Sequence, residues 1–189
     1  MNPTIGAAPL PFLLLLCASH AAAQPGAPPA PAPARSATLL SASLLGAYGA
    51  GGQFEGSDVN RFGLGFGARV GVSLERPGVF LGLSFVRYLG GKDSSGEYHT
   101  TTLNAEAGYD LLLAQGRVIV RPMLALGIAQ VATIQSDNAG YPLAFHGAPG
   151  LLVGLKLVPV LLSVEARNDV VAGSWSNALT FMLGAGVEL

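Results

Sequence analysis

His146, Ser163 and Glu165 carry the side chains best suited to catalysis in this sequence. A hydrolase or acyltransferase needs a nucleophile, a general base and an orienting carboxylate within reach of one another. The hydroxyl, the imidazole and the carboxylate have these chemistries, and they occupy polar positions of two successive strand-like segments. Because no recognisable motif surrounds them, they define only an alternative, a lipid-modifying enzyme, and we predict no catalytic residue.

A second histidine, His99, stands beside Thr100 and Thr101 and belongs to no recognisable catalytic pattern either. The spacing of His, Cys, Asp and Glu residues fits no metal site. The series Gly63-x-Gly65-x-Gly67 is not followed by a helix pattern, which a dinucleotide-binding loop would require. The sequence therefore predicts a non-enzymatic protein without a metal or a cofactor.

Charged side chains recur at polar positions of segments that are otherwise apolar or glycine-rich. If these segments are the strands of a closed barrel, six of the charged residues form a predicted lumen charge network in its interior: Arg69, Glu106, Asp110, Arg121, Glu165 and Arg167. Such a set could line a pore or a proton path, or it could pair internally and plug the lumen. The interior of an eight-stranded barrel is just wide enough for side chains to fill. We therefore favour the plug.

Arg87 does not fit the pattern, because strict alternation places it on the apolar face. Two arrangements would accommodate it. Its side chain could extend to lipid phosphate at the rim, or a β-bulge could turn it inward.

These charges lie in segments with a two-residue period, which is the signature of a strand with two different faces. From 62 to 74 the even positions are apolar, and the odd positions are glycine, serine and one arginine. The alternation defines eight segments, near 38–49, 62–74, 79–85, 102–111, 117–128, 145–157, 160–167 and 179–189. A tilted strand needs about 9–11 residues to cross a bilayer. We predict an all-β fold, a closed antiparallel eight-stranded up-and-down transmembrane β-barrel.

The composition of the 189-residue chain favours a membrane location. Hydrophobic residues make up 50% and charged residues 11%, and the mean hydropathy is +0.49. The single long apolar run, near the N-terminus, is too short for a spanning helix of about 20 residues. A closed barrel is the other architecture that crosses lipid. We expect the apolar face to meet lipid; a soluble ligand-binding barrel would instead turn that face inward.

The first 36 residues differ from the rest. Residues 1–23 resemble a secretory signal peptide, with an apolar stretch and an Ala-x-Ala site at Ala21–Ala23. Residues 24–36 form a Pro/Ala-rich linker, because proline removes backbone donors and fixes φ. The barrel domain is then expected at 37–189.

The predicted connections alternate between long and short along the chain. Those near 50–60, 90–96, 135–141 and 170–176 are long and polar, and those near 75–78, 114–116 and 158–159 are tight. Transmembrane barrels have long extracellular loops and short periplasmic turns. Aromatic residues prefer the membrane interface, so we predict an extracellular rim of Tyr48, Phe62, Tyr88, Tyr98, Tyr141 and Trp175.

The segment from Ala37 to Leu189 resembles the OmpA/OmpX-like small outer-membrane β-barrels in its alternation, its loop rhythm and its end. Gly184, Val187 and Leu189 match the glycine and apolar positions of that family's terminal-strand signal, whereas Met182 stands where a polar residue is usual. The resemblance implies a Gram-negative outer-membrane location. It also implies contact with the barrel-insertion machinery through the C-terminal strand.

Together these features predict a monomeric, non-enzymatic outer-membrane barrel with a structural or surface-interaction role through short extracellular loops. The expected partners are outer-membrane lipid and lipopolysaccharide. The net charge of −1 and the lack of charge blocks argue against a nucleic-acid partner.

Overall fold

The computed structural model describes residues 38–51, 60, 62–74, 78–93, 96–133, 143–172 and 176–189. The predicted signal peptide and linker lie outside these residues. The described strands are β1 (Thr38–Gly51), β2 (Gly63–Leu74), β3 (Val79–Asp93), β4 (Gly96–Tyr109), β5 (Leu111–Leu113), β6 (Val118–Thr133), β7 (Leu143–Leu157), β8 (Val160–Val171) and β9 (Ser176–Glu188).

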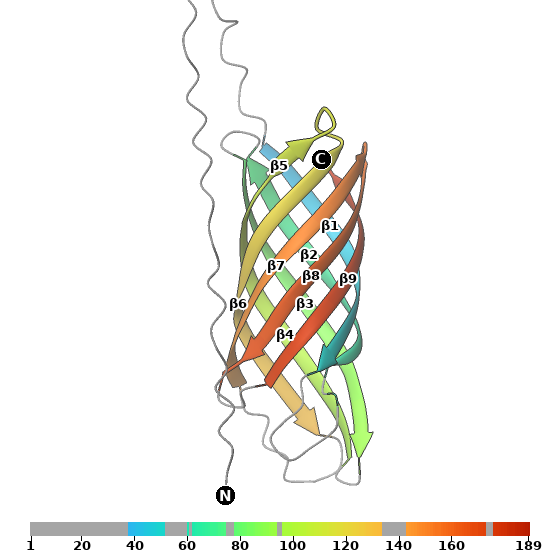
Figure 1. Ribbon diagram of the computed structural model, residues 1–189, viewed down its shortest axis with the longest axis vertical. Coiled ribbons are helices and arrows are strands. Elements are labelled where there is room, and N and C mark those ends of the chain that lie inside the picture. Colours follow the sequence, from blue (N-terminus) through green and yellow to red (C-terminus); the bar gives the residue numbers. More distant parts are fainter. Residues whose placement is uncertain are drawn as a thin grey trace, which may run out of the picture. The chain divides into compact units, whose positions relative to one another are not determined.

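These strands form one closed antiparallel barrel (Figure 1). Except for β4 and β5, consecutive strands pair along the chain. In addition, β4 pairs with β6, and β1 pairs with β9 from Ser41↔Glu188 to Gly51↔Ala178. Both β4 and the three-residue β5 pair with β6 and are separated by Asp110 alone, so they count as one strand of the barrel. The predicted eight-stranded up-and-down barrel is confirmed.

The two ends of the barrel differ in their connections. We call the end with the β5–β6 and β7–β8 turns the turn end, and the opposite end, where β1 finishes and β2 begins, the loop end. At the turn end, Ala114, Gln115 and Gly116 all have positive φ, and the Gly116 amide donates to the Leu113 carbonyl (3.0 Å). Such a tight turn leaves β5 and β6 in direct register.

The apolar face of the sheet is the outer surface. Leu44, Leu64 and Leu183 are 74%, 67% and 67% exposed, whereas the inward Arg69 and Arg167 are 4% and 2% exposed. This is the reverse of the burial that a soluble barrel requires. Arg87 is exposed on the outer face as well, because the only register shift of β3 lies beyond it, between Leu89 and Lys92.

Phe62 contradicts its predicted outward position, because it is 1% exposed and packs edge-to-face on Tyr88 at a ring distance of 5.0 Å. Gly63 follows it with φ +58°, which interrupts the extended alternation before β2 begins. The Asn60 side chain holds this corner, since its Oδ1 accepts from the Phe62 amide (3.0 Å) and its Nδ2 donates to the Gly49 carbonyl (2.6 Å).

The predicted long connection at 90–96 is also wrong. Strands β3 and β4 continue through most of it, with Lys92 paired to Glu97 and Asp93 paired to Gly96. The polar composition of this segment suggested a loop, but a strand that extends past the apolar band has no need of apolar residues. The β3–β4 connection is therefore a hairpin.

Glycines allow the strong curvature of this narrow sheet. A Cβ added to Gly127 would lie 2.0 Å from the Leu103 carbonyl oxygen, and one added to Gly67 would lie 2.1 Å from that of Phe85. Other inward glycines make room for long side chains, because a Cβ at Gly150 would lie 2.7 Å from the Cβ of Arg167. At both kinds of glycine position, even an added methyl group would clash with its neighbour.

We expect Gly127→Ala to lower the free energy of unfolding by about 1–3 kcal/mol, because the added methyl must displace backbone of the neighbouring strand. Gly46→Ala is the matched control, since a Cβ at Gly46 has nothing within 4 Å. Urea titration of both variants in lipid vesicles, followed by the fluorescence of the single tryptophan, measures the difference. Equal stabilities would show that close strand approach does not require Gly127.

Candidate functional site: the charged interior

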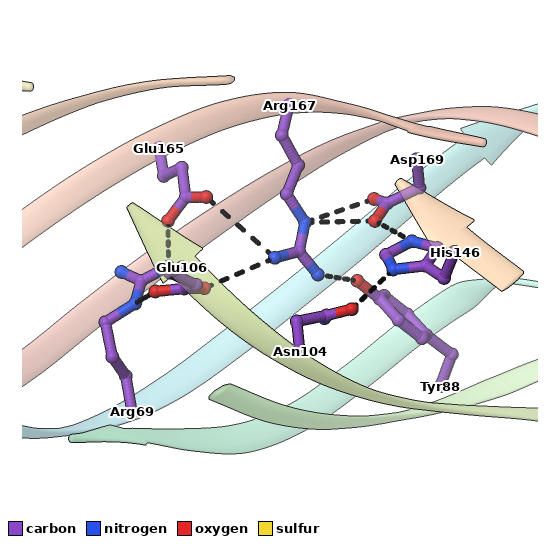
Figure 2. A network of polar contacts seen from close by, with 8 residues as sticks. All are labelled: Arg69, Tyr88, Asn104, Glu106, His146, Glu165, Arg167 and Asp169. Carbon is purple, nitrogen blue, oxygen red and sulfur yellow. Dashed lines mark hydrogen bonds and ion pairs between the residues drawn. The ribbon is translucent and has the colours of Figure 1, made fainter. Parts of the chain in front are cut away.

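A continuous group of polar side chains fills the middle of the barrel (Figure 2). Its members come from β2, β3, β4, β7 and β8, whose inward positions alternate with the exposed apolar ones. The central cluster consists of Arg69, Tyr88, Asn104, Glu106, His146, Glu165, Arg167 and Asp169. All eight residues are buried. The strand period thus brings together residues that are far apart in the chain.

Arg69 connects three strands through its guanidinium group. Its Nε and Nη2 donate to the two carboxylate oxygens of Glu106 at 2.6 and 3.1 Å, and Nη2 also donates to Glu165 Oε2 at 2.6 Å. A bidentate arginine–carboxylate pair is among the strongest hydrogen-bonded pairs in proteins. Because β2, β4 and β8 are not adjacent in the sheet, these bonds cross the lumen.

Arg167 forms the second centre of the cluster. Its Nε lies 3.1 Å from Asp169 Oδ1 on the same strand, and its Nη2 donates to the Tyr88 hydroxyl at 3.1 Å. Its Nη1 lies 3.9 Å from Glu106 Oε1 and 4.0 Å from Glu165 Oε1. Arg167 therefore links the Arg69 group to Asp169, and four of the six predicted network residues lie in one connected cluster.

His146 extends this cluster toward the loop end. Its Nε2 lies 2.8 Å from Asp169 Oδ1, and its Nδ1 lies 2.6 Å from Asn104 Oδ1. The side chains of His146 and Asp169 are both 0% exposed. Both ring nitrogens are thus engaged by oxygen atoms within the barrel and are closed off from solvent.

The other two predicted network residues form a separate group near the turn end. Arg121 donates from Nε and Nη2 to Asp110 at 2.5 and 3.1 Å, and from Nη2 to the Ser73 hydroxyl at 3.2 Å. Its guanidinium carbon lies 3.6 Å from the ring centroid of Phe80, a cation–π contact. Beyond them, Lys156 Nζ pairs with Glu188 Oε2 at 2.8 Å.

Apolar side chains close the interior on both sides of the central cluster. Toward the loop end, Tyr88 of the cluster also belongs to a buried apolar group, whose other members are Leu45, Ala47, Phe62, Val86, Ala129, Val171, Ala178 and Met182. Toward the turn end, Phe80 and Ile119 are 0% exposed and Leu161 is 6% exposed. A buried charge is costly unless it is paired, and here every described interior charge has an opposite charge within 4.0 Å. The arrangement suits a plug.

The predicted rim aromatics do not share one environment. Tyr48 is 50% exposed on the outer face, whereas Tyr88 and Tyr98 are 0% and 8% exposed and, like Phe62, lie inside the barrel. Their inward strand positions override the preference of an aromatic ring for the interface. Tyr141 and Trp175 lie outside the described residues.

The candidate catalytic residues are not assembled. Ser163 pairs with Gly154 on β7, eight positions from His146, which is about 26 Å along a strand. Glu165 is engaged by Arg69 instead. The described residues contain no group of three His, Cys, Asp or Glu side chains that could hold a metal ion. None of the described residues forms a helix with the length and hydropathy needed to span a membrane.

Four members of the cluster were missed by the sequence analysis as network residues: Tyr88, Asn104, His146 and Asp169. Asp169 follows Glu165 and Arg167 in the same two-residue period, so the inward phase of β8 could have identified it. Asn104 and His146 were placed at polar positions of their strands. Their contact depends on the register between two strands that are not adjacent in the sheet, and the alternation within one strand does not determine that register.

Comparison with solved structures relates the whole barrel to known proteins. Neisserial surface protein A matches over 80% of this chain and 96% of its own, with 19% identity and a TM-score of 0.54. The N-terminal β-barrel domain of Pseudomonas aeruginosa OprF (16% identity, TM-score 0.52) and the Yersinia pestis attachment invasion locus protein Ail (13%, 0.56) each match over 80% of this chain and 97% of their own. No protein-family model and no curated protein sequence matches. The chain thus has the fold of the OmpA/OmpX-like barrels, as its pattern predicted.

We expect Arg69→Leu to lower the free energy of unfolding by about 3–5 kcal/mol, because it leaves buried Glu106 and Glu165 without their bidentate partner. Urea titration in lipid vesicles measures this loss. The double variant Arg69→Leu/Glu106→Leu should lose less than the sum of the two single variants, because the first substitution already breaks the pair. Strictly additive losses would mean that the two residues do not act together.

Proposed function

We propose that this protein is a non-enzymatic integral protein of the Gram-negative outer membrane, a rigid closed barrel that supports the envelope and presents its loops at the cell surface. The observation that carries the proposal is that the barrel has an apolar outer surface and an interior filled by ion pairs. We expect such a molecule to be stable only in lipid and to offer no continuous aqueous path.

The membrane assignment rests on the outer face. Its strands carry leucine, valine and phenylalanine side chains at 39–74% exposure over most of their length, and an apolar surface of this extent is unstable in water. The location in the outer membrane is supported by the likeness to Neisserial surface protein A, OprF and Ail. A signal peptide at 1–23 would deliver the chain, and β9 would be read by the insertion machinery.

The alternative of a lipid-modifying enzyme receives no support from the interior. His146 is the base that such an enzyme would use, and its two ring nitrogens contact Asn104 and Asp169 inside the barrel. Lipid cannot reach an imidazole that is 0% exposed. The hydroxyl of Ser163 lies on a distant part of the barrel.

The surface role is assigned to the loop end, where lipopolysaccharide is the expected neighbour. Arg87 supports this contact, since it is exposed on the outer face and is paired with Phe66 and Thr101 on the flanking strands. A long arginine side chain can extend along apolar surface to reach a phosphate. A rigid barrel leaves loop sequences free to change, which suits contact with a surface partner.

The membrane topology can be tested on intact cells. We expect cysteines at Ser57, Ser95 and Ser136 to react with an impermeant maleimide, and a cysteine at Gln115 in the tight turn to react only after the outer membrane is opened. Fractionation and gel mobility before and after boiling provide the control that each variant is folded in the outer membrane. Labelling of Gln115 alone on intact cells would reverse the topology and remove the loop role.

We expect the purified barrel to show no large, steady conductance in planar bilayers, because paired charges and the flanking apolar groups occupy the lumen. The double variant Arg69→Ala/Glu106→Ala, which removes two large side chains from the centre of the lumen, serves as the comparison. A stable channel in the unmodified protein would contradict the plug.

A further inference from the structure

The apolar outer surface is not uniform, because a groove crosses strands β6 to β9 near the turn end. Outward side chains form its walls: Val118, Val153, Leu155, Leu162, Val164 and Leu183. Between them lie Gly154, Ser163 and Gly184. These three positions belong to the inward phase, so only backbone and small atoms form the floor. The groove has a volume of about 430 Å³, which is in the range of small-molecule sites.

A second hollow lies at the turn end, lined by residues next in sequence to those of the groove. It has a volume of about 420 Å³ and is lined by Gln115, Gly116, Arg117, Lys156, Leu157 and Val158. Arg117 directly precedes Val118 of the groove, and Lys156 directly follows Leu155. The Lys156 amide donates to the Arg117 carbonyl at 2.7 Å, which fixes the two strands side by side at this point.

The hollow contains one cation that is free to bind a ligand. Lys156 is occupied by Glu188 at 2.8 Å. Arg117 is exposed, and among the described residues no ion pair involves it. Val158, which shares the hollow, is 87% exposed. A hydrophobic side chain beside an unpaired guanidinium is the chemistry of a membrane boundary, with hydrocarbon on one side and headgroups on the other.

We infer that the groove and the hollow together bind one anionic phospholipid, with an acyl chain in the groove and the phosphate at Arg117. The inference rests on the proposed membrane location, because hydrocarbon is then the only medium that reaches the groove. Charge complementarity selects the headgroup: guanidinium binds phosphate oxygens through paired N–H donors. Basic pockets at the ends of apolar surfaces bind anionic lipids in other membrane proteins.

The test is native mass spectrometry of the full-length protein, refolded into detergent and incubated with phosphatidylglycerol or phosphatidylethanolamine. We expect one phosphatidylglycerol to remain bound, with about five-fold weaker binding in Arg117→Gln. Arg117→Lys is the matched control, since it keeps the positive charge at the same position, and it should retain the lipid. Equal loss in both variants would mean that the charge at this position does not hold the lipid and would overturn the site.

Two further arms test the groove and the source of the phosphate. Val153→Phe should weaken binding by filling the groove, whereas Leu81→Phe, an exposed position on β3, should not. Glycerol phosphate should not compete with the lipid, because it has no acyl chain. Equal retention of both phospholipids, or competition by glycerol phosphate, would refute the inference. Heat-modified gel mobility reports folding separately, so a failure to bind lipid is distinguishable from a failure of the proposed function.

Discussion

Closure of the sheet is the constraint on which the rest of this structure depends. Hydrocarbon offers no partners for backbone N–H and C=O groups, so an open edge cannot lie in lipid. Here β1 and β9 remove that edge, and the ladder continues to the last residues, where Leu40 and Leu189 exchange both backbone hydrogen bonds at 2.9 and 2.8 Å. Once the sheet closes, every inward position faces a narrow enclosed space. That space explains the glycines at Gly67 and Gly127, and it explains why each interior charge among the described residues has an opposite partner.

The fold was largely predictable because one period governs nearly every strand. From Gly63 to Leu74 the outward and inward positions follow the sequence alternation without exception. Closure was implied by an apolar composition without an apolar run long enough for a spanning helix. The errors arose where the two-residue alternation of the strand stops, or where residue type was given more weight than the inward or outward position of the residue in that alternation. Phe62 turns inward because Gly63 adopts a positive φ. Tyr88 was assigned to the interface for its ring, although its phase on β3 is that of the inward Ser84 and Val86.

Half of the central cluster was predictable from the sequence, and the contacts between its members were not. Alternation placed Arg69, Glu106, Glu165 and Arg167 inside, as the structure has them. Which of them touch depends on strand stagger and on how strands face one another across the lumen, and neither is encoded in a single segment. The same limitation made His146 and Ser163 look like neighbours, because they lie on successive strands, although the β7–β8 register separates them.

The reach of the Arg69 contacts bears on how the barrel assembles. This residue bonds to Glu106, 37 positions away in the chain, and to Glu165, 96 positions away. None of these bonds can exist until β2, β4 and β8 surround a common space. A half-inserted sheet would therefore hold unpaired guanidinium and carboxylate groups next to hydrocarbon, which costs a large amount of free energy. Partly inserted intermediates are thereby disfavoured, and insertion and closure become a single cooperative event.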